Sequence, residues 1–139
     1  MRTLNAILLL LAIGSQPSVA SAADKAFVGV FEGTGRACSG ALFVRSKTLE
    51  WNSTYSTCKS TRYEILEQKV SDGHERIVFR LKNRSKQCRF EVVEVEHVSD
   101  YNWNVSGYPN LESYEKRNFP DWKDSPLPER QTFSCPMTK

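Results

Sequence analysis

The sequence predicts an all-β protein, in which a small antiparallel meander of seven or eight strands closes into a barrel, lipocalin-like or similar, that carries two disulfides. Three observations lead to this prediction. Apolar and polar residues alternate along short runs, which indicates strands rather than helices. Turn residues separate these runs every 8–12 positions or so. The chain also contains four cysteines, an even number. A β-sandwich is the alternative, but consecutive hairpins favour the barrel, because closure leaves no strand edge unpaired.

Turn residues set the limits of the expected strands. Gly33 and Gly35 end the first strand, and together with Gly29 they are expected at bends or bulges. Asp72-Gly73 is a strong signal for a hairpin between two later strands. We expect strands near 27–32, 41–45, 48–52, 62–69, 76–81, 88–97 and 101–106, and an eighth near 130–135.

Two hairpins have a register that the apolar pattern predicts. Pairing Arg45 with Thr48 at the first tip sets apolar residues opposite each other on one face, and a register through Asp72-Gly73 does the same for the second hairpin. The predicted pairs are Leu42 with Trp51, Val44 with Leu49, Leu66 with Phe79 and Gln68 with Ile77. We expect the barrel interior to be filled by Leu42, Val44, Leu49, Trp51, Leu66 and Phe79.

The four cysteines are Cys38, Cys58, Cys88 and Cys135, and in an exported chain they predict two disulfides. Four cysteines allow three pairings, and the sequence does not choose among them. The first hairpin favours Cys38–Cys58, since its register brings both residues to the open end, and Cys88–Cys135 would then follow. No Cys-x-x-Cys spacing is present, which argues against a zinc site.

Residues 1–22 have the pattern of a cleaved signal peptide. Arg2 supplies a positive start, residues 6–13 are apolar, and Ala20-Ser21-Ala22 offers a small-residue cleavage site. The apolar run is too short to span a bilayer, so we expect no stable membrane anchor after cleavage. The expected product is one β-domain over 23–139, with an irregular region at 107–139, in the periplasm or secreted.

One group of candidate binding residues lies in that irregular region. Tyr108, Tyr114, Phe119 and Trp122 are aromatic, and Arg117 lies among them. Exposed aromatic rings beside cations are typical of protein interfaces. The alternative is a loop folded over one mouth of the barrel. Residues 110–118 are expected to form either a short helix capped by Asn110 or an irregular strand.

A second group is basic and comprises Arg80, Lys82 and Arg84, followed by Lys86 and Arg89. These residues predict an anion-binding patch, or else a solvated hairpin tip with charges that protect a strand edge. The formal net charge of the whole chain is only +3, which argues against nucleic acid as a partner.

The sequence shows no catalytic, cofactor or metal motif. The glycine-rich stretch 27–40 lacks the Gly-Lys-Ser/Thr of a phosphate loop, and no Gly-x-Ser-x-Gly elbow is present. The remaining titratable cluster is expected to be a solvated strand face rather than a metal site, and its members are Glu91, Glu94, Glu96, His97 and Asp100. We therefore expect neither an enzyme nor a cofactor.

A small, disulfide-bonded barrel with basic and aromatic loops suggests an exported, non-enzymatic binding protein with a protein partner in the cell envelope or outside the cell. Ser39-Gly40-Ala41-Leu42-Phe43 resembles the Ser-Gly-x-x-aromatic stretch of small periplasmic lysozyme inhibitors. That resemblance implies an inhibitor or immunity-type protein acting on a cell-envelope hydrolase such as a lysozyme. The Lys-Gly element of that family is absent here, so no inhibitory residue is carried over. The alternative is a carrier of a small apolar ligand inside the barrel.

Overall fold

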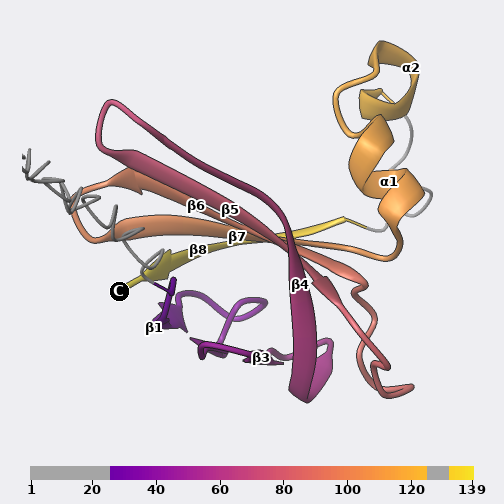
Figure 1. Ribbon diagram of the computed structural model, residues 1–139. Helices are drawn as coiled ribbons and strands as arrows, with labels where there is room; N and C mark the ends of the chain where they lie inside the picture. Colours follow the sequence, from indigo (N-terminus) through magenta and orange to yellow (C-terminus); the bar gives the residue numbers. More distant parts are fainter. Residues whose placement is uncertain (1–25, 125–131) are drawn as a thin grey trace, which may run out of the picture.

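The computed structural model describes residues 26–124 and 132–139, and it confirms the antiparallel barrel. Each strand pairs with the next, and β1 pairs with β8 to close the barrel (Figure 1). The strands are β1 (Gly29–Gly33), β2 (Gly40–Val44), β3 (Thr48–Asn52), β4 (Thr57–Ser71), β5 (His74–Leu81), β6 (Val92–Ser99), β7 (Asn102–Tyr108) and β8 (Phe133–Thr138). The expected signal peptide lies outside the described residues.

The region predicted to be irregular contains two short helices and the last strand of the barrel wall. Helix α1 (Leu111–Lys116) begins as predicted at Asn110, whose side-chain oxygen accepts a hydrogen bond from the Ser113 N–H at 2.8 Å. Helix α2 (Pro120–Lys123) follows it. Strand β8 begins three residues later than expected.

The predicted register holds for one hairpin and fails in part for the other. Leu42 pairs with Trp51 and Val44 with Leu49, as predicted. Gln68 also pairs with Ile77. The prediction that Leu66 pairs with Phe79 is wrong.

A bulge in β4 is the physical reason for that error. Ile65 pairs with Phe79 and Glu67 pairs with Val78, so Leu66 is an extra residue in β4. Leu66 packs against an outer apolar cluster that includes Val78, and it does not contribute to the interior.

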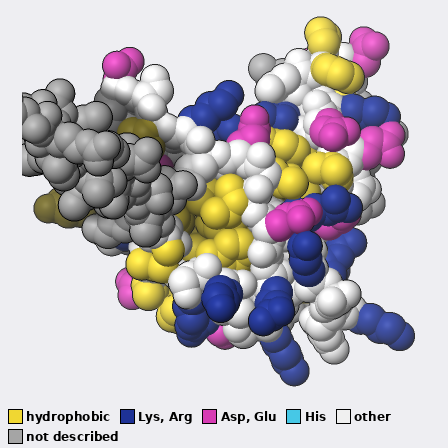
Figure 2. Space-filling model, viewed as in Figure 1, with side chains coloured by type: hydrophobic (Ala, Val, Ile, Leu, Met, Phe, Trp, Pro, Cys, Tyr) yellow, Lys and Arg dark blue, Asp and Glu magenta, His cyan; other side chains and the backbone are white. Residues whose placement is uncertain are grey.

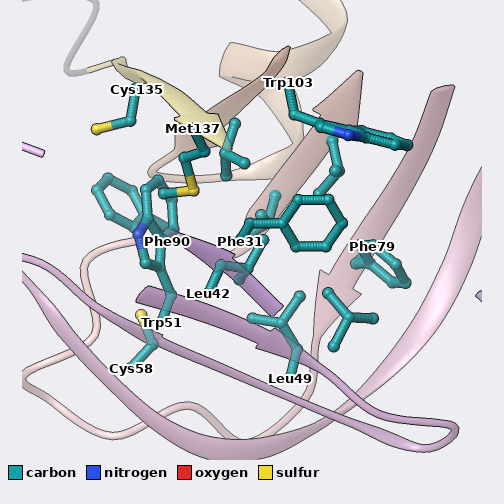
Figure 3. Packing of buried hydrophobic residues seen from close by; sticks show 14 of the residues in the cluster. Phe31, Leu42, Leu49, Trp51, Cys58, Phe79, Phe90, Trp103, Cys135 and Met137 are labelled. Carbon is teal, nitrogen blue, oxygen red and sulfur yellow. The ribbon is translucent and has the colours of Figure 1, made fainter. Parts of the chain in front are cut away.

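The interior is packed with large side chains (Figure 3). Each such residue stabilises the fold by about 1.5–3 kcal/mol when it leaves water. Of the predicted interior residues, all except Leu66 are in this core. The largest fully buried members are Trp51, Phe31, Phe79, Leu42, Leu49, Ile77 and Met137.

The disulfides are Cys38–Cys135 and Cys58–Cys88, so the favoured Cys38–Cys58 pairing is wrong. The chain turns back after Asn52, and Cys58 enters β4 opposite Trp51 instead of extending the first hairpin. The closure of β1 against β8 brings Cys135 to Cys38, a contact that no local pattern shows.

The two ends of the barrel are built differently because alternate connections of a meander lie at the same end. The hairpin end has the short turns β2–β3, β4–β5 and β6–β7. The loop end has the connections β1–β2 (34–39), β3–β4 (53–56), β5–β6 (82–91) and β7–β8 (109–132). The helices project from the loop end, opposite the tip of the β4–β5 hairpin (Figure 1).

Candidate functional site

The loop end carries an open hollow, which we call the loop-end hollow. Its volume of about 1230 Å³ exceeds the roughly 300–1000 Å³ that is usual for a small-molecule pocket. The side chains that define it come from β3–β4, β5–β6 and β8, and they are Tyr55, Arg84, Lys86, Arg89, Phe90 and Phe133.

The floor of the hollow is a stack of aromatic rings. Phe90 and Phe133 are nearly parallel, with centroids 6.0 Å apart, and both stack on the buried Trp51, at 5.0 and 5.8 Å. Tyr55 meets the Phe133 ring edge-on and is 60% exposed. Gly107 lies against this stack, since a Cβ there would lie 2.6 Å from the Phe90 ring. The floor therefore rests on the barrel core, and the exposed part of it is Tyr55 with the partly exposed Phe133.

Three exposed cations surround this floor: Arg84, Lys86 and Arg89. None of the three forms an ion pair with an acidic side chain in the part of the chain that the structure describes. In Figure 2, Lys and Arg side chains project from the lower right of the molecule, where the β5–β6 connection lies in Figure 1. These cations leave a positive charge available to a ligand.

The other members of the predicted basic patch are neutralised. Arg80 binds Glu91 at 2.9 Å and approaches Glu64 at 3.8 Å, and Lys82 binds Glu64 at 3.1 Å. These pairs lie along the barrel wall. The predicted patch therefore divides into a paired half, Arg80 and Lys82, and an unpaired half that begins at Arg84.

Side-chain hydrogen bonds and a disulfide fix the β3–β4 connection to β5–β6. The buried Ser56 hydroxyl donates to the Gln87 carbonyl at 3.2 Å and accepts from the Arg89 N–H at 3.0 Å. Cys58–Cys88 joins the same two segments covalently. The backbone that carries Lys86 and Arg89 is therefore held in place before any ligand binds.

A second polar cluster, which we call the α1 clamp, lies on the outside of the barrel under α1. Arg76 is its centre: it donates to Glu94 at 2.8 Å, to Glu67 at 2.9 Å and to the Tyr114 hydroxyl at 2.7 Å. The Tyr114 hydroxyl in turn donates to Glu67. The bulge at Leu66 makes this possible, because it turns Glu67 toward Arg76.

The α1 clamp shifts the titration of its members. Burial, followed by the hydrogen bond to Glu67, raises the pKa of Tyr114 to about 12. Hydrogen bonds from Tyr114 and Arg76 hold the pKa of Glu67 below its ordinary value. Glu94 is only 8% exposed, so the expectation that its strand face is solvated is wrong for this residue. The clamp joins α1 to the barrel wall.

The residues of the predicted aromatic site fall into two groups, one buried beside the α1 clamp and one exposed to solvent. Tyr108 and Tyr114 are buried, and Arg117 lies over the Tyr114 ring at 3.9 Å, so these three hold α1 in place. Burial raises the pKa of Tyr108. Phe119 is 58% exposed and Trp122 is partly exposed. Helix α1 packs on the outer face of the sheet, not over a mouth of the barrel.

Three residues of the floor, Tyr55, Phe90 and Phe133, were missed by sequence reasoning. A signal was present for two of them, since Phe90 follows Cys88 by two positions and Phe133 precedes Cys135 by two. Because each cysteine takes part in a disulfide near the loop end, aromatic residues beside them share that end.

Residues 26–124 and 132–139 contain no group of three or more potential metal ligands, and no helix there is long and apolar enough to cross a membrane. Two disulfides are compatible with a periplasmic or extracellular protein.

No family model, curated protein sequence or solved structure matches this chain.

Proposed function

We propose that this chain is an exported, non-enzymatic binding protein that holds an acidic segment of a partner protein in the loop-end hollow. In its most concrete form it is an inhibitor or immunity-type protein acting on a cell-envelope hydrolase such as a lysozyme. One observation carries the proposal: three cations without an acidic partner among the described residues surround an aromatic floor whose Tyr55 ring is exposed.

The chemistry of the hollow suits such a segment. Guanidinium and ammonium groups make charge-assisted hydrogen bonds with carboxylates, and Arg84, Lys86 and Arg89 offer three of them. The Tyr55 and Phe133 rings can take an apolar side chain between those carboxylates. The braced connections reduce the entropy lost when a partner binds.

The filled interior favours surface binding over the carrier alternative. A carrier needs an internal cavity lined by small side chains, whereas Trp51, Phe79 and Met137 occupy this interior. The loop-end hollow lies outside that core. A ligand seated there would contact the rim cations, so it would be anionic rather than purely apolar.

The test compares two triple variants that remove the same charge. R84A/K86A/R89A removes the rim of the hollow, and K47A/K59A/R62A removes three cations elsewhere. The mature protein and both variants are used to capture partners from the cell envelope and culture fluid, and are assayed against purified lysozymes. We expect one stoichiometric partner, or inhibition of hydrolysis. The first triple variant should bind or inhibit about ten-fold or more weakly than the native protein, and the control triple variant should match the native protein.

A partner that both triples retain equally would overturn the proposed site. A partner that both lose equally would mean that net charge, not the hollow, is recognised. A small apolar molecule found in the native protein by mass spectrometry, with no protein partner, would support the carrier instead.

A further inference from the structure

The seam that closes the barrel is short. Within the described ranges, β1 meets β8 in only two residue pairs, Glu32 with Thr138 and Gly33 with Met137. Strand β1 therefore runs past the end of β8 at the hairpin end. Lys139, the residue after β8, lies in the space that remains.

The side chain of Lys139 crosses this gap and ends over three aromatic rings. Its ammonium nitrogen is 5.4 Å from the ring centroids of Phe27 and Phe31 and 5.3 Å from that of Trp103. A cation within about 6 Å of a ring centroid is attracted by the negative face of the ring. We call Phe27, Phe31 and Trp103 the seam cage.

Phe27 and Phe31 are stacked at 14°, and Trp103 packs against both rings. Trp103 stands at 71° to Phe31 and at 59° to Phe27, and all three centroids lie within 5.9 Å of one another. Figure 3 shows the Trp103 ring beside Phe31, at the opposite side of the core from Trp51 and Phe90. The three rings touch one another, so they present one continuous aromatic surface to the Lys139 ammonium.

Two features indicate that the cage accepts a cation from outside the core. A Cβ at residue 29 would lie 2.8 Å from the Cε atom of Lys139, so the bare backbone of Gly29 makes room for an aliphatic chain entering through the seam. Lys139 also forms no ion pair with any acidic side chain that the structure describes. The rings are thus the groups that face its charge.

We propose that the seam cage is a binding site for a trimethylammonium group, which Lys139 occupies in the free protein and which the ligand displaces. A methylated ammonium sheds its water more easily than the primary ammonium of lysine, and its methyl groups contact all three rings. The ligand is a small molecule or a lipid that carries this group. The site is at the opposite end from the loop-end hollow and does not depend on the proposed function.

The first experiment is a titration with choline chloride, followed by the indole N–H signal of Trp103 in NMR spectra. The signals of Trp51 and Trp122 are internal references. K139M keeps most of the aliphatic chain and removes the competing charge, and K59M is a matched control on the outside of β4. We expect K139M to bind choline about ten-fold more tightly than the native protein, and K59M to match the native protein.

A neutral molecule of the same shape tests the role of charge. 3,3-Dimethylbutan-1-ol replaces the trimethylammonium nitrogen by carbon, and we expect it to leave the Trp103 signal unchanged. An equal response to both molecules, or no response of Trp103 to choline in folded K139M, would overturn the proposal. W103L should abolish binding, and if W103L does not fold, F27L, which removes one ring, should weaken it.

Phosphatidylcholine vesicles distinguish the two sources of the group. Co-sedimentation of K139M with these vesicles, and not with phosphatidylglycerol vesicles, would identify a lipid headgroup. Choline binding without co-sedimentation would identify a free small molecule. Each of these results supports the cage as the site.

Discussion

The hairpin end and the loop end of this barrel are stabilised by different means. At the hairpin end the chain reverses through tight turns with left-handed residues, where φ is 51° at Asp72, 78° at Gly73 and 47° at Asp100. At the loop end the connections are longer, and Cys38–Cys135 and Cys58–Cys88 fix them. Left-handed residues also occur at the loop end, at Gly35, Gly40 and Asn83, so the loop end differs in its disulfide contacts between segments far apart in the sequence.

This difference explains why the loop end is the better place for a binding site. A tight turn has few residues to vary, and its conformation depends on them. A long connection can carry exposed side chains such as Arg84 and Lys86, provided that other contacts hold it. Here Ser56 and Cys58–Cys88 supply those contacts, so the exposed side chains of this connection do not have to stabilise the fold themselves.

The largest expected effect comes from removing a disulfide. Cys38–Cys135 closes a loop with a sequence separation of 97, and Cys58–Cys88 one of 30. Restriction of the unfolded chain then predicts losses of about 4.7 and 3.6 kcal/mol, respectively, in the free energy of unfolding. Denaturant unfolding of C38A/C135A and C58A/C88A measures both losses. A larger loss for the shorter loop would show that strain or residual structure outweighs chain entropy.

A pair of glycine substitutions compares the two ends directly. Gly107→Ala places a Cβ 2.6 Å from the Phe90 ring, and this overpacking should cost about 1–3 kcal/mol. Gly73→Ala meets no atom within 4 Å, and its cost of about 1 kcal/mol comes from the left-handed backbone alone. Unfolding curves measure both costs. Near-ultraviolet circular dichroism should change only in G107A, and an unchanged spectrum there would mean that the ring stack does not move.

The α1 clamp gives a smaller, pH-dependent effect. The pKa of Tyr114 rises from 10.0 in the unfolded chain to about 12, so the stability that its neutral hydroxyl contributes is complete below pH 10 and is lost between pH 10 and 12. Tyr114→Phe should cost about 1 kcal/mol at neutral pH and remove this part of the alkaline loss. Unfolding of both proteins across this pH range checks it. Parallel curves for the native protein and Y114F would contradict the assignment.

Features that depend on neighbouring residues could be predicted from the sequence, whereas features that depend on contacts between distant segments could not. The β2–β3 register followed from alternating apolar residues between Leu42 and Trp51, and the helix cap followed from Asn110, because both depend on neighbouring residues. The disulfide pairing failed because it depends on the closure of β8 against β1. The aromatic floor was missed for the same reason, since its rings come from three separate segments.

The β4 bulge had a wider effect than one mispaired residue. The extra residue moved Leu66 out of the core and brought Glu67 to Arg76, which created the α1 clamp. No glycine marks this bulge, so the alternating pattern through 62–69 concealed it. The clamp also buries Tyr108 and Tyr114, two of the residues proposed from the sequence as candidates for an interface.

The smallest expected effect on stability belongs to the basic residues, and it separates the two halves of the predicted patch. Arg80 is paired, so Arg80→Ala should cost up to about 1 kcal/mol, and less at high salt. R84A/K86A/R89A removes three cations that no acidic side chain in the described ranges binds, so its free energy of unfolding should stay within about 0.5 kcal/mol of the native value. Unfolding at low and high salt measures both. If the triple variant is clearly destabilised, these cations support the fold. That result would contradict the proposal that they are free to bind an acidic partner. If the free energy of unfolding of the triple variant is unchanged while its partner binding falls, these three cations act in binding and not in stability. This is the result expected where Ser56 and Cys58–Cys88 hold the connection in place.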